Sequence, residues 1–272
     1  AITPNGRHCF LIPWRGCTLI GTTDKAYLGH PDDYRVTRQS IEELIMEVNA
    51  SFSGLAIKYE DIQHCYGGLR PLVENQTEET YTSSRKYEIH DHSTDGINGM
   101  MTVEGGKWTT SRHLAEKVID RLGDKTGLPI SRSVSDRKYL KGSEIKDISV
   151  FINRIKRENR DFDEDTVDYL ARIYGTACEE ILSLARKNPA MAGRLNTEGD
   201  ILAQAVYAVR NEMAHTLKDI VLRRTGIATL GNPGEDVLRR VAETVAGDLG
   251  WDENRVKREV DETMAFLKIP TD

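Results

Sequence analysis

Residues 105–112, Gly-Gly-Lys-Trp-Thr-Thr-Ser-Arg, stand between a predicted apolar strand and a predicted amphipathic helix. A glycine turn that leads into a helix presents backbone N–H groups without intrahelical partners, together with the positive end of the helix dipole. Such a turn suits an anion or an electron-rich part of a cofactor. Its spacing matches neither the GxxxxGK[ST] phosphate loop nor the GxGxxG dinucleotide motif. The segment therefore predicts an anion or cofactor site and leaves the ligand open.

Arg70 belongs to a second segment of interest, Gly67-Gly68-Leu69-Arg70-Pro71. The glycines permit close backbone approach, and Pro71 restricts Arg70 to an extended conformation. A guanidinium held in one direction offers a planar fork of donors that suits phosphate or carboxylate. An ordinary ion pair explains the same residues equally well, so this segment alone does not decide between them.

His90 and His92 alternate as residues on a strand do, and they could share one face. Two histidines on one face could bind a metal ion. An exposed, Asp-rich turn is the favoured interpretation, because no third ligand is evident from the spacing. We therefore predict no metal site.

The composition bounds the class of protein. The 272 residues include 37 Lys and Arg against 43 Asp and Glu, a net charge of −6. This balance argues against a nucleic-acid coat protein, which needs an excess of cations. No apolar run is long enough to span a bilayer, although association with a membrane surface stays open. The 4 cysteines form no CxxC pair, which favours reduced thiols and a cytoplasmic protein.

The elements that must position these residues divide the chain near residue 140. We predict an α+β protein with a mixed or antiparallel sheet portion at residues 1–140, followed by an all-helical domain at 141–272. The sheet portion contains a helix at 108–122 that Gly123 ends, and Pro233 is expected at the first position of a later helix. Further expected elements are a helix at 37–53, strands at 7–12, 17–21, 62–69, 85–90 and 100–104, and helices at 147–157, 165–174, 176–186, 199–213 and 216–224.

Asn5-Gly6 is a strong hairpin signal, because both central positions of a type I′ turn need positive φ. Only four residues precede it, and a first strand needs more. We therefore expect the chain to be a fragment of a longer protein. A short natural N-terminal tail is the alternative.

Several motifs occur together in one order and spacing. The chain resembles the C-terminal part of aerobic, FAD-dependent glycerol-3-phosphate dehydrogenases, which are D-amino-acid-oxidase-like flavoproteins. The resemblance covers nearly the whole chain, and each motif alone is weak. The motifs are Gly6-Arg7 with Ile12-Pro13-Trp14, Gly21-Thr22-Thr23-Asp24, Gly68-Leu69-Arg70-Pro71-Leu72, Arg85 through Tyr87 to His90-Asp91, Gly105-Gly106-Lys107-Trp108-Thr109-Thr110, Val206 through Arg210 to Glu212-Met213-Ala214, and Arg223-Arg224-Thr225.

The resemblance implies an oxidoreductase of glycerol metabolism that converts sn-glycerol 3-phosphate to dihydroxyacetone phosphate by hydride transfer to FAD. Quinone is the expected electron acceptor and oxygen the alternative. The protein is expected to be cytoplasmic, to lie at the inner face of the membrane as a peripheral protein, and to form a homodimer. Residues 1–140 would be the C-terminal portion of the FAD- and substrate-binding domain, with the dinucleotide motif upstream of Ala1.

The resemblance also implies site residues. Arg70, Arg85 and Lys107 match substrate-binding positions, and Gly105, Gly106, Lys107, Thr109 and Thr110 match flavin-binding positions. The general base is not assigned and is expected upstream of Ala1. A different flavin oxidoreductase with another anionic substrate, or a non-catalytic helical interaction module, are the competing interpretations. The glycine turn argues against the module, because a scaffold has no use for its chemistry.

Overall fold

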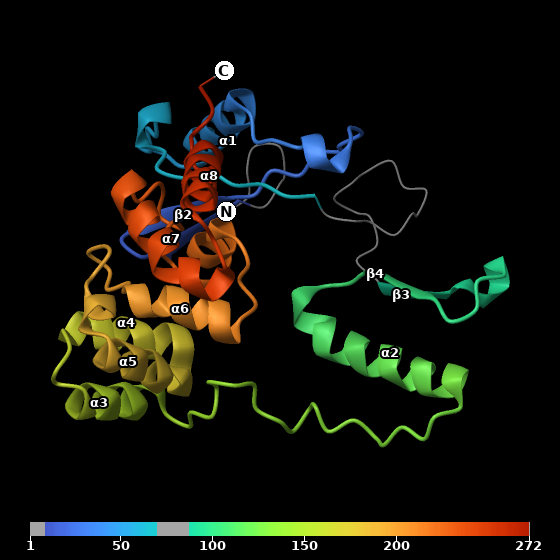
Figure 1. Cartoon of the computed structure of the whole chain (residues 1–272). Coiled ribbons are helices and arrows are strands. Elements are labelled where there is room, and N and C mark those ends of the chain that lie inside the picture. The colour runs from blue at the N-terminus through green and yellow to red at the C-terminus, as the bar shows by residue number, and fades with distance from the viewer. Residues whose placement is uncertain (1–8, 70–86, 272) are drawn as a thin grey trace. The chain divides into compact units, whose positions relative to one another are not determined.

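The computed structural model describes residues 9–69 and 87–271, and their contacts form two compact units (Figure 1). We call residues 9–22, 36–66 and 140–271 the helical unit, and residues 23–35, 67–69 and 87–139 the hairpin unit. The predicted domain boundary after residue 140 stays a prediction. The contacts place residues 9–22 and 36–66 with the helical segment that follows this boundary.

The hairpin unit is built on two antiparallel strands, β3 (Tyr87–Asp91) and β4 (Met101–Gly105). A single 3₁₀ turn, His92–Asp95, follows β3. A second one, Trp108–Thr110, joins β4 to helix α2 (Ser111–Thr126). The glycine turn therefore lies between a strand and a helix, as the sequence predicted.

Gly123 does not end α2, which corrects the sequence prediction. The helix continues to Thr126 and ends at Gly127, whose φ of +66° is left-handed. Gly123 is buried inside the helix, where a Cβ atom would lie 2.8 Å from Cδ1 of Ile130. The close packing of Ile130 against α2 therefore explains why a glycine stands at position 123.

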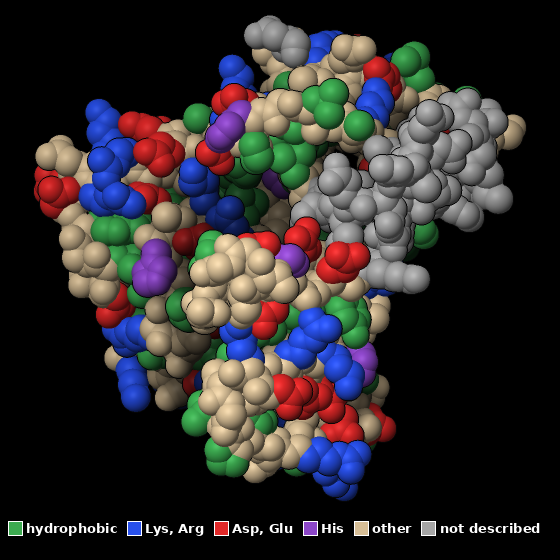
Figure 2. Space-filling view, turned by 90° about the vertical axis from the view of Figure 1, so that its right-hand side faces the viewer, with side chains coloured by type: hydrophobic (Ala, Val, Ile, Leu, Met, Phe, Trp, Pro, Cys, Tyr) green, Lys and Arg blue, Asp and Glu red, His purple; other side chains and the backbone are tan. Residues whose placement is uncertain are grey.

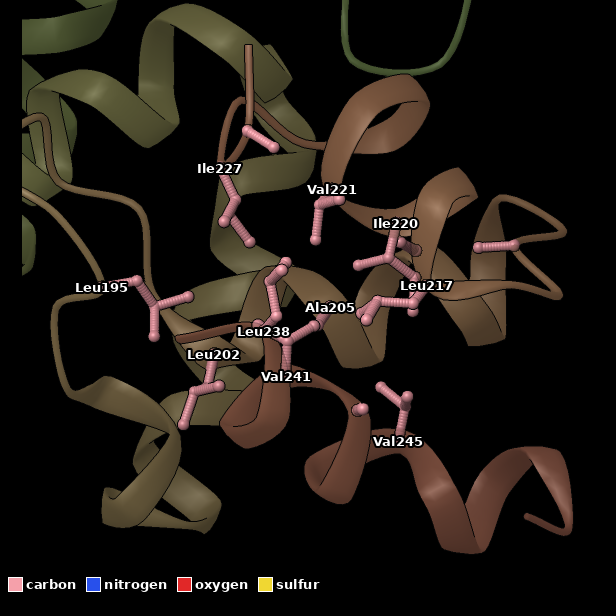
Figure 3. Packing of buried hydrophobic residues seen from close by; sticks show 14 of the residues in the cluster. Leu195, Leu202, Ala205, Leu217, Ile220, Val221, Ile227, Leu238, Val241 and Val245 are labelled. Carbon is pink, nitrogen blue, oxygen red and sulfur yellow. The ribbon is translucent and has the colours of Figure 1, made fainter. Parts of the chain in front are cut away.

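The helical unit contains most of the buried apolar side chains. The helices of residues 141–272 are α3 (Ile148–Glu158), α4 (Glu164–Tyr174), α5 (Cys178–Lys187), α6 (Leu202–Asn211), α7 (Glu235–Leu249) and α8 (Glu253–Phe266). Residues from α6, α7, α8 and the segments on either side of α6 meet in one core (Figure 3). The labelled members of that core are Leu195, Leu202, Ala205, Leu217, Ile220, Val221, Ile227, Leu238, Val241 and Val245.

Two predicted helices in this unit differ from the structure, one in its hydrogen-bond pattern and one in its first residue. The segment expected as a helix over 216–224 contains a π-helical stretch, Asp219–Arg224. Helix α7 begins at Glu235 with Gly234 as its N-cap, so Pro233 precedes the helix instead of starting it. The φ of Gly234 is +93°, a conformation that glycine adopts without strain.

The N-terminal part of the helical unit pairs β1 (Phe10–Trp14) with β2 (Cys17–Gly21) in an antiparallel hairpin. Helix α1 (Arg38–Ser51) follows, capped by Thr37, whose hydroxyl accepts from the Ser40 N–H. The expected strand at 62–69 is wrong, because these residues have no regular structure. Gly67 and Gly68 weaken a strand there, since they have no side chain to pack. The remaining short 3₁₀ turns are Pro31–Asp33, Tyr59–Asp61, Gly175–Ala177 and Pro189–Ala192.

A buried ion pair ties the β1–β2 turn to the helices. The Arg15 Nη2 donates to Asp200 Oδ2 at 2.9 Å, and Asp200 is fully buried. Asp200 also accepts from the Tyr169 hydroxyl, the Gln204 amide and the Asn196 amide. Because the carboxylate has a partner for each oxygen, the charge can be buried at a tolerable cost.

The α+β class, with small antiparallel sheets followed by a helical C-terminal part, is confirmed. None of the helices within residues 9–69 and 87–271 is long and apolar enough to cross a membrane.

Candidate functional site

The glycine turn depends on backbone conformations that favour glycine. Gly105 and Gly106 have φ values of +72° and +92°. A residue with a Cβ atom would be strained in this left-handed region, whereas glycine is not. A Cβ atom on Gly106 would also lie 3.5 Å from Leu114 Cδ2 and 3.7 Å from Tyr87 Cβ. The two glycines thus let the chain reverse from β4 into α2 while the backbone stays close to the hairpin.

Lys107 and Thr110 close the turn through their own atoms. The Lys107 N–H donates to Thr110 Oγ1 at 3.3 Å, and that hydroxyl donates to the Lys107 carbonyl at 3.1 Å. The Thr110 N–H donates to the same carbonyl at 3.0 Å. The Thr110 hydroxyl therefore shapes the turn, which is a role that the sequence prediction of a cofactor contact did not include.

The side chains around the turn face solvent. Lys107, Trp108 and Thr109 are exposed, and Trp108 is 96% exposed. The structure thus brings together an exposed ammonium, a positive-φ glycine pair and the N-terminal end of a 16-residue helix. This donor set is complementary to an anion or to the electron-rich edge of a ring.

Arg70 and Arg85 lie outside the described residues, so their convergence with Lys107 stays a prediction. The general base also stays unassigned. Lys107, Gly105, Gly106, Thr109 and Thr110 are neighbours in space, but their contact with substrate or flavin stays a prediction as well.

A charged cluster lies near the opposite end of the hairpin. The Lys125 ammonium of α2 donates to Asp91 Oδ1 at 2.6 Å, and Asp91 also accepts from the N–H and hydroxyl of Ser93. The hydrogen bonds from Lys125 and Ser93 hold the pKa of the Asp91 carboxyl well below its usual range. The cluster fixes the loop after β3 against α2.

Asp95 is a group that sequence reasoning missed. Its carboxylate lies against both His90 and His92. The sequence Asp91-His92-Ser93-Thr94-Asp95-Gly96 has an N-cap residue at its start and a glycine at its end. This is the signal for a single helical turn, which places residues three apart on one side.

Acidic and basic side chains are interspersed on the face shown in Figure 2. The net charge of −6 leaves the chain as a whole with no excess of positive charge for a phosphate backbone.

Two family profiles match the chain. The profile of the C-terminal domain of alpha-glycerophosphate oxidase matches residues 101–256, and that of the FAD dependent oxidoreductases matches residues 1–112. The two matches overlap at residues 101–112, which contain β4, the glycine turn and the start of α2.

Curated relatives carry the names of glycerol-3-phosphate dehydrogenases. A glycerol-3-phosphate dehydrogenase of Synechocystis sp. is 31% identical over 264 residues, which are 96% of this chain and 48% of the relative. An aerobic glycerol-3-phosphate dehydrogenase of Staphylococcus saprophyticus is 29% identical over 91% of this chain and 45% of its own length. The chain therefore spans about half the length of these relatives.

A solved structure shares the fold. The glycerol-3-phosphate dehydrogenase from Bacillus halodurans, solved in complex with FAD, matches with a TM-score of 0.79 at 26% identity. The match covers 99% of this chain and 52% of that one.

Proposed function

Because the chain belongs to the family of the C-terminal domain of alpha-glycerophosphate oxidase, we propose that it forms part of an FAD-dependent enzyme that oxidises sn-glycerol 3-phosphate to dihydroxyacetone phosphate. The observation that carries the proposal is the glycine turn at residues 105–107. It lies where the oxidoreductase and oxidase profiles overlap, and its geometry suits an anionic or electron-rich ligand.

The turn fits a flavin in the chemistry of its donors. FAD accepts the hydride when it is bound. In an FAD-loaded protein the backbone N–H groups of the turn, the N-terminus of α2 and the Lys107 ammonium would supply positive potential, which would stabilise negative charge on the flavin. Gly106 lets the backbone approach closely, because it lacks the Cβ that would add bulk there.

In our proposal, cationic side chains bind the phosphate group of the substrate. A phosphate monoester carries about −1.5 to −2 charges at neutral pH. Arg70 and Arg85 would bind it with their planar donor forks, and Lys107 would add a third cation. Positioning the substrate in this way holds the reacting C–H bond near the flavin, which lowers the entropic part of the barrier.

The electron acceptor is quinone in our proposal, and the enzyme would work as a homodimer on the cytoplasmic surface of a membrane. Oxygen is the second candidate acceptor. It is favoured by the family description, which names an oxidase, whereas the names of the relatives specify dehydrogenases.

The proposal is tested in a protein that joins this chain to a dinucleotide-binding domain. Anaerobic addition of sn-glycerol 3-phosphate should bleach the visible absorbance of bound flavin, while sn-glycerol 1-phosphate and glycerol should do so far more slowly. Readmission of oxygen or addition of a soluble quinone then distinguishes the two acceptors. Flavin that stays oxidised with sn-glycerol 3-phosphate, in a correctly folded and FAD-loaded protein, would contradict the proposal.

A further inference from the structure

His90, His92 and Asp95 bring three metal-binding atoms together in the hairpin unit. His90 Nε2 and His92 Nδ1 each lie 2.9 Å from Asp95 Oδ2, and the three atoms lie within 4.8 Å of one another. We propose that this His–His–Asp triad binds one divalent transition-metal ion of the zinc type. The proposal does not depend on the proposed function.

The triad is distinct from the glycine turn. His90 pairs with Thr102 in the hairpin, whereas Gly105 pairs with Tyr87 near the other end. Three residues along a strand correspond to about 10 Å. A metal ion at the triad therefore has no direct contact with the backbone of the glycine turn.

The backbone holds the turn that carries two of the ligands. Asp91 caps it by accepting from the Ser93 N–H at 2.9 Å, and Gly96 ends it with a left-handed φ of +81°. The Ile97 N–H donates to the carbonyl of His92 at 2.9 Å. Such a preformed turn reduces the conformational entropy that ordering the ligands would cost.

Thr102 supports His92 from the neighbouring strand. His92 Nε2 lies 2.7 Å from the Thr102 hydroxyl. When Nε2 carries the proton and donates to that hydroxyl, the lone pair of Nδ1 is directed toward Asp95. A hydrogen bond that fixes the second ring nitrogen is the usual support of a metal-binding histidine.

The ligand types select the class of metal. Imidazole nitrogen with one carboxylate suits zinc and its neighbours in the first transition row, whereas calcium and magnesium prefer oxygen ligands alone. Bonds of about 2.0–2.1 Å in a tetrahedron place ligand atoms about 3.3 Å apart. The two separations of 2.9 Å from Asp95 must lengthen slightly to reach this value, and the nitrogens of His90 and His92, which lie within 4.8 Å of each other, must take up the same spacing.

The site is charged and open to solvent. Asp95 offers a carboxylate oxygen beside ring nitrogens of both histidines. The side chains of His90, His92 and Asp95 are 49%, 21% and 49% exposed. Three protein ligands with an open side leave at least one position for water or another small ligand.

Zinc binding to the full 272-residue chain tests the proposal. The protein is treated with chelator, its accessible thiols are blocked with N-ethylmaleimide, and zinc is titrated in by calorimetry. We expect one equivalent to bind, with an affinity that falls as the pH is lowered, because protons compete for the imidazole nitrogens. His90→Ala and Asp95→Asn should each weaken binding by about 100-fold or more, and Thr102→Val by about 10-fold.

His113→Ala is the matched control. His113 is an exposed histidine that lies 3.8 Å from one carboxylate, that of Glu116, so its removal should leave the zinc affinity unchanged. Cobalt should give visible ligand-field absorption that is lost in Asp95→Asn, and circular dichroism verifies that each variant is folded. The proposal is overturned if the wild-type chain takes up no zinc, or if folded His90→Ala and Asp95→Asn bind it as tightly as His113→Ala.

Discussion

At the scale of the residue, the proposed function depends on two kinds of cation. Arg70→Lys keeps the charge but loses the two-pronged donor geometry. In the FAD-loaded protein we expect kcat/KM for sn-glycerol 3-phosphate to fall by an amount equivalent to about 1–3 kcal/mol, with flavin content unchanged. Activity on uncharged glycerol should be equally weak in both proteins. An equal fractional loss on both substrates would return Arg70 to a structural role.

Lys107→Met removes an ammonium from the glycine turn, and we expect slower flavin reduction in stopped-flow measurements. The physical reason is the loss of positive charge near charge that develops on the ring. Lys117→Met is the control, because Lys117 is an exposed lysine further along α2 that lies 3.8 Å from Asp120. Equal rates in the two variants would remove Lys107 from the site.

At the scale of the element, the β1–β2 turn depends on the buried pair of Arg15 and Asp200. Arg15→Met leaves a fully buried carboxylate without its cation, and we expect the free energy of unfolding to fall by about 3–5 kcal/mol. The control, Arg223→Met, removes an exposed pair with Asp219 and should cost no more than about 1 kcal/mol. Chemical denaturation measures the free energy of unfolding of both variants. Similar decreases would mean that the buried pair stabilises the protein no more than an exposed pair does.

At the scale of the whole molecule, the contacts within the helical unit predict how stable residues 144–272 are without the rest of the chain. Residues 144–272 have helices with their own apolar faces and caps, so we expect them to fold alone and to melt cooperatively. They lack Arg15 and the packing of residues 9–22 and 36–66, so the melting temperature should lie below that of the full chain. Far-ultraviolet circular dichroism with thermal melting measures both. A non-cooperative melt would show that the segment depends on the rest of its unit.

Local signals in the sequence determined much of the secondary structure. Asp147 and Asp252 are the N-cap residues of α3 and α8, and each accepts from a backbone N–H three residues on. The glycine turn was visible for the same reason: positive φ and a helix start are properties of a few adjacent residues. These features are set by short-range sterics and hydrogen bonds, which a single sequence displays directly.

Only the tertiary structure decided the contacts between distant segments. The sequence predicted that Gly123 ends α2. The structure shows instead that the Ile130 side chain occupies the space that a Cβ atom at position 123 would need. Arg15 meets Asp200 across 185 positions, and no periodicity connects them. Such contacts depend on how the chain closes its loops and packs its core, and a local pattern does not encode that closure.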